Sequence, residues 1–415
     1  MRTPAAPVLG TERRLMDFRF SEEEEAFRKE VQDFLAEALP DDWLGVDPDG
    51  HNEQADEELH QIDLEMRRKL ASKGWLGLEW PKEYGGQEAV LMKRFILEQE
   101  LIYRGAPYWA ISGALMIGDF ILQFGTEEQK RKFVPPIARG EAQWVVAMSE
   151  PNAGSDLANL QLRAVEEEDC FVLNGQKTWQ TGAHYADWGI VYARTDPEVR
   201  KHKGISVFLV DMESPGITMR RIPQMTGHPA FCEVFYDNVR VPKENLLGER
   251  NAGWSVALFA VATEKSFGYW LINSAKRDFE MLVEYCRETS VNGQPLAKDP
   301  LIRNRLAQMA IEMEVGRNLG ARCNWMATRG MTIISEACQM KPFGGNFVQR
   351  LADLGTHILG LYGQLDEKSK WAKLRGRIKY LYLAAAAMTI EGGTNEASRN
   401  TVAGFGLGLP REPRH

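Results

Sequence analysis

The spacing of hydrophobic residues along the chain changes twice. Up to about Gly140, apolar residues recur every three or four positions, which predicts helices with one buried face. From there to about Gly248, apolar and polar residues alternate, which predicts strands. The helical spacing returns at Gly253 and holds nearly to the end. The pattern therefore predicts a mainly α protein with a central β domain, in which the long C-terminal helices pack as a bundle.

Local signals place several element boundaries. Ser21 precedes four glutamates and is expected to cap the first helix, and Thr126 is expected to cap another. Asn174-Gly175 is the commonest two-residue hairpin signal, so we expect a hairpin turn there. Further helices are predicted at about 55–72, 91–103, 110–124, 253–290, 300–329, 332–363 and 368–389, and strands at about 143–148, 170–173, 188–194, 205–210, 217–221 and 232–236.

Composition and charge exclude several classes of protein. The chain has 415 residues, of which 44% are hydrophobic, and a net charge of -8 spread along its length, so no basic stripe indicates nucleic acid as a partner. No apolar run reaches the roughly 18 residues of a membrane span, and the N-terminus lacks the apolar core of a signal peptide. Five scattered cysteines form no metal-type pair, so we expect a cytoplasmic protein without a metal site or disulfide framework.

Two segments of the β region have the composition of a ligand-binding site. Residues 151–155 are Pro-Asn-Ala-Gly-Ser, and such small residues let the backbone approach a ligand while N–H and hydroxyl groups bind its oxygens. In residues 176–181, the indole of Trp179 lies two positions from the hydroxyl of Thr181. An aromatic plane beside hydroxyl donors suits a flat polar ring.

These two segments also carry a family resemblance. Residues 148–156 (MSEPNAGSD), followed by residues 174–181 (NGQKTWQT), resemble the flavin-binding middle domain of the acyl-CoA dehydrogenase family. The resemblance covers about 17–412. It implies an acyl-CoA dehydrogenase-like fold with an N-terminal helical domain, a β-barrel-like middle domain and a C-terminal four-helix bundle. The expected limits of these domains are 17–140, 141–249 and 250–412.

The resemblance implies a reaction as well. It is the FAD-dependent α,β-dehydrogenation of an acyl-CoA thioester to trans-2-enoyl-CoA in lipid degradation, in which a glutamate removes the α-proton and the β-carbon gives a hydride to flavin N5. An electron-transferring flavoprotein or similar acceptor is the implied partner, in a homotetramer or mixed oligomer. Two alternatives stay open. One is an acyl-CoA oxidase or flavin monooxygenase on the same fold, and the other is a non-catalytic structural partner subunit of a hetero-oligomer. The acyl group can be straight, branched, aromatic or a steroid side chain.

Two glutamates are candidates for the base. Glu264 falls on an apolar helical stripe in line with Ala257, where a carboxylate is unusual unless it has a partner or a function. The segment resembles family members of the long-chain and isovaleryl type, in which a glutamate on this helix is the base. Glu391 lies near the base of medium- and short-chain members, but aligning Gly393-Thr394 with the family's Gly-Thr step puts Gly392 at the base position. We therefore take Glu264 as first choice and Glu391 as alternative. The backbone N–H of Gly392 would donate to the thioester oxygen.

The resemblance also assigns the cofactor contacts. Residues of the middle segment would bind the flavin ring, residues near 394–396 would approach it from the C-terminal bundle, and a Gly-rich segment at 360–363 would hold the adenosine part bound by a neighbouring subunit. Residues 289–298 depart from the family, because they lack the Arg and the aromatic residue that many members provide for the partner's FAD. The assigned cofactor-binding residues are Met148, Ser149, Gly154, Ser155, Trp179, Thr181, Gly360, Gly363, Thr394 and Glu396.

Overall fold

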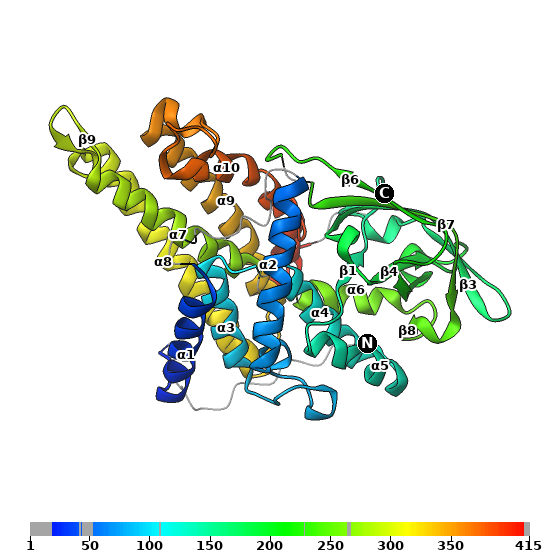
Figure 1. The fold of residues 1–415 in the computed structure, drawn as a ribbon. Helices are drawn as coiled ribbons and strands as arrows, with labels where there is room; N and C mark the ends of the chain where they lie inside the picture. The colour runs from blue at the N-terminus through cyan, green and yellow to red at the C-terminus, as the bar shows by residue number, and fades with distance from the viewer. Residues whose placement is uncertain are drawn as a thin grey trace.

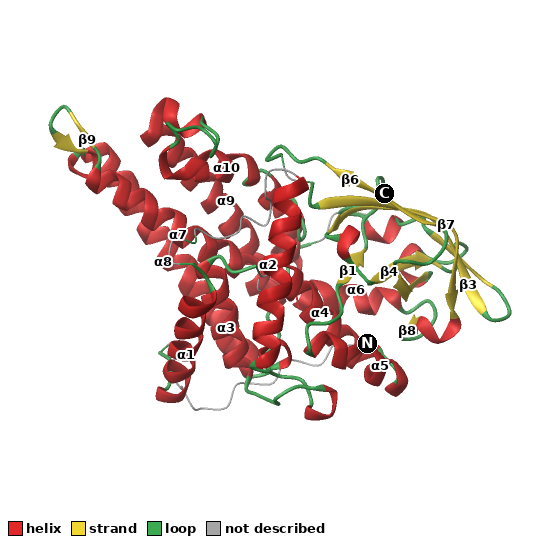
Figure 2. Cartoon of the chain, in the orientation of Figure 1, coloured by secondary structure: helices red, strands yellow, loops and turns green. Residues whose placement is uncertain are grey.

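Helices form both ends of the chain and a sheet forms its middle. A computed structural model describes residues 19–40, 43, 53–107, 109–227, 229–263 and 267–410 (Figure 1). In Figure 2 the strands gather on one side of the molecule and the long helices on the other. The structure confirms the predicted mainly α fold with a central β region. Among the described residues, no helix is both long enough and apolar enough to cross a membrane.

Within its described residues, the N-terminal part forms five α-helices. The two predicted caps are confirmed, because Ser21 and Thr126 each accept a backbone N–H bond and each receives the reciprocal side-chain bond of a capping box. The helices are α1 (Glu22–Ala38), α2 (Glu53–Ser72), α3 (Leu91–Arg104), α4 (Trp109–Phe124) and α5 (Glu127–Ala138).

Eight strands form one sheet in the order β6-β7-β3-β2-β4-β5-β8, and β1 pairs in parallel with β4. Most neighbouring strands are antiparallel. The strands are β1 (Trp144–Ala147), β2 (Arg163–Glu166), β3 (Cys170–Thr181), β4 (Trp188–Arg194), β5 (Ile205–Asp211), β6 (Ile217–Ile222), β7 (Phe231–Pro242) and β8 (Leu246–Leu247).

The predicted hairpin turn at Asn174-Gly175 is wrong. Both residues lie inside β3, which continues to Thr181, and the register with β7 shifts between Leu173 and Gly175. A Cβ atom at Gly175, where φ is +145°, would lie 2.9 Å from the Cα of Leu162. The glycine therefore permits a close backbone approach at a bulge. The chain reverses earlier, between β2 and β3, where Glu167 N–H donates to the Cys170 carbonyl at 2.9 Å.

The C-terminal helices pack mainly as a bundle, in which α7, α8, α9 and α10 surround one apolar core. The short strands β9 (Ser290–Val291) and β10 (Gln294–Pro295) form a hairpin between α7 and α8. The helices are α6 (Gly253–Thr263), α7 (Phe267–Glu288), α8 (Pro300–Thr328), α9 (Ile334–Leu359), α10 (Arg377–Ala384) and α11 (Asn395–Thr401).

The continuous helix predicted at 368–389 is also wrong, because only Arg377–Ala384 is α-helical there. Leu374 and Arg375 have left-handed φ values of 50° and 52°. Gly376 has a φ of 75°, and a Cβ at this position would lie 2.6 Å from the backbone nitrogen of Glu367. Trp371, an apolar residue of this segment, is exposed. The segment therefore folds as turns before a short helix.

Strands β4 and β5 of the sheet are buried on both faces. Along β4, Ile190 and Tyr192 belong to a core shared with the N-terminal helices and α6, whereas Val191 and Ala193 belong to a second core on the other side of the sheet. This alternation explains why β4 and β5 read as apolar runs. In Figure 1, α4, α5 and α6 lie against the sheet, so the faces of β4 and β5 are not open to a ligand.

A buried ion pair joins α7 to α10 and gives a stability prediction. The guanidinium of Arg377 donates to both carboxylate oxygens of Asp278, at 2.7 and 3.2 Å, and the Asp278 side chain is 3% exposed. We expect Asp278→Ala to lower the free energy of unfolding by about 3–5 kcal/mol, because it leaves a partly buried cation without its carboxylate. Denaturant unfolding measures the change.

The matched control is Asp353→Ala. Asp353 pairs with Arg305 at 3.3 Å on the surface, and both side chains are about half exposed. Its loss should cost less than about 1 kcal/mol. Equal effects of the two substitutions would contradict this account of the bundle.

Candidate functional site

A loop that follows β1 is held against the end of β3. Glu150 and Ala153 exchange two backbone hydrogen bonds of 3.1 and 3.0 Å, which close a tight turn. Just before this turn, the carbonyl of Ser149 accepts the N–H of Thr178 at 2.9 Å. Two segments that are far apart in sequence therefore lie side by side, and they carry the predicted flavin contacts Met148 and Ser149 on the loop and Trp179 on the strand.

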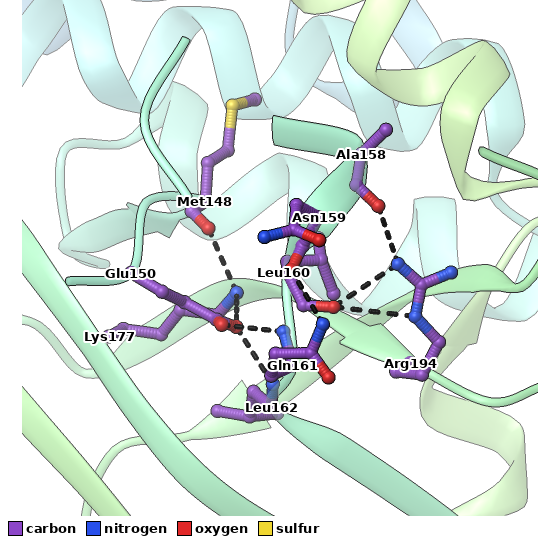
Figure 3. A network of polar contacts seen from close by, with 9 residues as sticks. All are labelled: Met148, Glu150, Ala158, Asn159, Leu160, Gln161, Leu162, Lys177 and Arg194. Carbon is purple, nitrogen blue, oxygen red and sulfur yellow. Dashed lines mark hydrogen bonds and ion pairs between the residues drawn. The ribbon is translucent and has the colours of Figure 1, made fainter. Parts of the chain in front are cut away.

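A fully buried lysine ties the loop to the strand. Lys177 of β3 is 0% exposed, and its ammonium group donates to the carboxylate of Glu150 and to the carbonyl of Met148, both at 2.9 Å (Figure 3). The Glu150 carboxylate also accepts the backbone N–H groups of Gln161 at 2.5 Å and Leu162 at 2.8 Å. One ion pair thus fixes both ends of the loop. Burial lowers the pKa of Lys177 to about 8, although the Glu150 carboxylate acts in the opposite direction.

A second buried cation binds the far part of the same loop. The guanidinium of Arg194 donates to the carbonyl of Ala158 at 2.6 Å and to that of Leu160 at 3.1 and 3.3 Å (Figure 3). It also donates to the carbonyl of Lys201. Burial lowers the pKa of Arg194. Carbonyl dipoles rather than a carboxylate are therefore the direct partners of this guanidinium.

Trp179 adopts an unusual backbone conformation at the edge of this loop. Its φ is +61°, in the left-handed region, and the register with β7 shifts between Lys177 and Gln180. A non-glycine residue in that region costs about 1–2 kcal/mol. The bulge leaves the indole 58% exposed, with its edge against Phe231 at 5.8 Å between ring centroids. A large aromatic plane held outward in this way is typical of a ligand contact.

The residues around Trp179 fit a flavin. Within the described part of the chain, the side chains of Ser149, Trp179 and Thr181 make no hydrogen bond, so their donors are available to a ligand. Gly154 and Ser155 are exposed just after the tight turn, and a Cβ at Gly154 would meet nothing within 4 Å. Packing within the chain therefore does not require a glycine at that position. These groups together offer an aromatic face and polar donors to a flat heterocycle.

The candidate base Glu391 and its neighbours lie on the turn before α11 (Asn395–Thr401). Glu391 is half-buried, and its N–H donates to the carbonyl of Ala387 at 2.9 Å. Gly392 and Gly393 have left-handed φ values of 57° and 87°. The N–H of Gly392 makes no hydrogen bond within the described residues. The turn therefore presents a backbone donor beside a carboxylate.

Thr394 and Glu396 continue this group into α11. The hydroxyl of Thr394 accepts the N–H of Ala397 at 3.0 Å and caps the helix. Glu396 is exposed and pairs with Arg399 at 3.2 Å. Glu396 thus lies at the surface of the chain, whereas Thr394 already has a role within the helix.

Helix α9 holds the Glu391 turn in place. The buried Lys341 donates to the carbonyl of Met388 at 2.5 Å, and the amide of Asn395 donates to that of Asn346 at 3.1 Å. A Cβ at Gly345 would lie 2.8 Å from the Met388 carbonyl oxygen, so the turn approaches α9 closely. The segment that carries Glu391 is thus fixed on both sides.

Other predicted residues are not brought to either group. Gly360 and Gly363 lie beyond the C-terminal end of α9, about 20 Å along the helix from Asn346 at 1.5 Å per residue. Within one chain they are therefore remote from Thr394, whose neighbour Asn395 contacts Asn346. Glu264, the first choice for the base, lies outside the described residues.

Sequence reasoning missed the buried cations. Lys177, Arg194 and Lys341 each place a positive charge at a position of 7% exposure or less. Lys177 is followed in β3 by the buried polar residues Thr178 and Gln180, so no alternation of apolar and polar residues marked Lys177 as buried. Its partner, 27 residues earlier, could not be identified from spacing alone.

Three family models match the chain. The N-terminal domain of acyl-CoA dehydrogenases matches residues 21–141, the middle domain residues 145–239 and the C-terminal domain residues 251–407. The three matches follow one another in the order predicted from the resemblance. Both motifs of the loop site, around residues 148–156 and 174–181, fall within the middle-domain match.

Similar proteins span the same length. The chain is 32% identical to the acyl-CoA dehydrogenase FadE26 of Mycobacterium tuberculosis, over 96% of this chain and 100% of that one. A solved structure named Tcur3481-Tcur3483 steroid ACAD has a TM-score of 0.84 at 31% identity, over 96% of this chain and 100% of that one. The ChsE4-ChsE5 complex from Mycobacterium tuberculosis gives a TM-score of 0.80 at 30% identity, over 95% and 100%.

The lowered pKa of Lys177 predicts how stability depends on pH. The folded value is about 8 and the ordinary value is 10.5, so between these pH values the unfolded chain binds more protons at this site than the folded chain. The stability that wild type has relative to Lys177→Met should therefore increase from pH 8 to pH 10.5. Unfolding midpoints of both proteins, compared at equal flavin content at several pH values, measure this difference.

Lys243→Met is the matched control. Lys243 pairs with Glu166 at 2.9 Å on the surface of the same sheet region, and its side chain is 40% exposed. The difference in stability between Lys243→Met and wild type should change little over the same pH range. If the stability of wild type relative to Lys177→Met decreased as the pH rose, the result would contradict the burial of a charged lysine.

Proposed function

The chain belongs to the acyl-CoA dehydrogenase family, and from this premise we propose that it converts an acyl-CoA thioester to a trans-2-enoyl-CoA with FAD as cofactor. One observation carries the proposal. Met148 and Ser149 are held beside Trp179 through the Thr178–Ser149 backbone bond and the Lys177 ammonium group. Residues that resemble the family's flavin contacts thus lie together, and the side-chain donors of Ser149 and Trp179 make no hydrogen bond within the described residues.

The reaction needs three groups to converge. When bound, FAD would supply the acceptor for the hydride from the β-carbon. The α-proton of a thioester is weakly acidic, so a carboxylate must lie within hydrogen-bonding reach of the α-carbon. Donors must also face the thioester oxygen as it gains negative charge. The N–H of Gly392 is our candidate for one of these donors, because it has no partner within the described residues.

We assign the base to Glu264, with Glu391 as the alternative. The left-handed φ of Gly392 disfavours a side chain at that position, so the carboxylate must come from elsewhere. Glu391 is adjacent and half-buried, which keeps it as a rival. A carboxylate in a site that excludes water has a higher proton affinity than one in solution, which suits a base that acts on carbon.

Similar proteins guide our proposals for the substrate class and the partners. The name of one similar structure describes a steroid ACAD, so thioesters with a steroid side chain are the first substrates to test. We propose an electron-transferring flavoprotein or a similar protein as electron acceptor. Oxygen consumption during turnover would instead indicate an acyl-CoA oxidase or a flavin monooxygenase. We also propose a cytoplasmic location.

A second candidate is a structural partner subunit in a mixed oligomer. The hairpin β9–β10 at the far end of α7 and α8 contains Ser290, Val291 and Gln294, without the arginine and the aromatic residue that many family members carry there. The solved ChsE4-ChsE5 complex is likewise named for two chains. In such an assembly the partner would complete the cofactor site, and a homotetramer would need other residues for that purpose.

Anaerobic reduction of the bound flavin tests the reaction and the base together. Wild type, Glu264→Gln, Glu391→Gln and the control Glu284→Gln are mixed with short, long, branched, aromatic and steroid acyl-CoA thioesters, and loss of the visible flavin absorption is followed. Glu284 is an exposed residue of α7. We expect Glu264→Gln to slow reduction by about 10²–10⁴-fold, the usual contribution of a general base, and Glu284→Gln to react like wild type.

The other outcomes separate the alternatives. A strong effect of Glu391→Gln with none of Glu264→Gln would move the base to Glu391. Protein that holds no flavin, or flavin that none of the thioesters reduces, would contradict the proposed reaction and favour the partner subunit.

A further inference from the structure

The buried Lys177–Glu150 pair lies next to the candidate flavin contacts. Lys177 lies two residues before Trp179 on β3, and Glu150 follows Ser149 directly on the loop. We propose that Lys177 and Glu150 are positioning residues that set the loop and Trp179 in the relative placement that binds flavin. This inference rests on the proposed function.

The hydrogen bonds of the pair are directional. Lys177 Nζ donates to Glu150 Oε1 and to the Met148 carbonyl, both at 2.9 Å. The two carboxylate oxygens of Glu150 accept the N–H groups of Gln161 and Leu162 as well. Both ends of the loop are therefore fixed in angle and distance. Apolar side chains of the same volume could fill this space but would not fix the Met148 carbonyl.

Energetics supports a role other than stability. An ion pair removed from water gains little net stability, and apolar residues of similar volume often replace such a pair without loss. Lys177 is 0% and Glu150 7% exposed, so both charges are fully desolvated. The pair provides a defined geometry for the residues beside it, which an apolar contact would not provide.

The strain at Trp179 depends on the same anchor. The left-handed residue lies between Lys177, fixed by Glu150, and Gln180, which pairs with Cys232 of β7. If Lys177 lost its partner, the strand could relax towards a regular register, and in a strand a shift by one residue turns a side chain to the other face. The direction of the indole is thus coupled to the ion pair.

A double-mutant cycle separates positioning from stability. Glu150→Gln, Lys177→Met and the double variant are compared with wild type for unfolding temperature, for the FAD dissociation constant and for the visible absorption and circular dichroism of the bound flavin. Each single variant leaves a buried group without its partner and should be less stable than wild type. We expect the double variant to recover the unfolding temperature while FAD binding stays at least tenfold weaker and the flavin spectra stay altered.

Recovery of FAD affinity and spectra together with stability would overturn the proposal, because the pair would then be structural only. If the double variant does not recover its stability, Leu209→Ala provides the reference. Leu209 is fully buried in β5, in the core that the sheet shares with the N-terminal helices. At an equal loss of unfolding temperature, Lys177→Met must weaken FAD binding at least tenfold more than Leu209→Ala, and an equal weakening would overturn the proposal.

Failure of the proposed function gives a different result. If wild type binds FAD but no acyl-CoA reduces the flavin, the proposed reaction is contradicted. The double-mutant cycle still tests the positioning role, because it measures FAD binding. Wild type that reacts with acyl-CoA while all variants bind FAD equally well contradicts only the positioning role. A wild-type chain that binds no FAD contradicts both.

Discussion

Burial of the Lys177 ammonium group constrains the whole loop after β1. A desolvated cation needs hydrogen-bond acceptors, and here these are the Glu150 carboxylate and the Met148 carbonyl. The carboxylate in turn orders the end of the loop through two backbone N–H groups. The buried charge of Lys177 thus joins a loop and a strand that are distant in sequence and are not paired with each other as a hairpin.

The rest of the fold explains why the site lies at the ends of strands. Strands β4 and β5 are covered on one face by the N-terminal helices and α6 and on the other by a second core, so their faces are closed to ligands. The exposed polar groups of the predicted cofactor site lie where β1 ends at Ala147 and where β3 ends at Thr181. In the C-terminal bundle, helix α9 fixes the segment that carries Glu391, because Lys341 donates to the carbonyl of Met388.

The periodicity of the sequence predicted the strands that depend on burial of apolar residues. It missed the contacts that depend on which residues pair in the folded chain. The apolar runs at 188–194 and 205–210 predicted β4 and β5 correctly. The hairpin at Asn174-Gly175 was wrong, because the glycine serves a close approach to Leu162 rather than a turn. Both loop motifs were identified in advance, whereas the Lys177–Glu150 pair depends on three-dimensional register. The cofactor roles, the assignment of the base and the domain limits stay predictions.

The most direct measurement is an experimental structure of the protein with FAD bound. The account predicts that the isoalloxazine ring lies against Trp179, with Met148 and Ser149 at its polar edge and the Lys177–Glu150 pair intact beneath the loop. A flavin bound elsewhere, or a Trp179 indole folded back onto its own sheet in the complex, would contradict it.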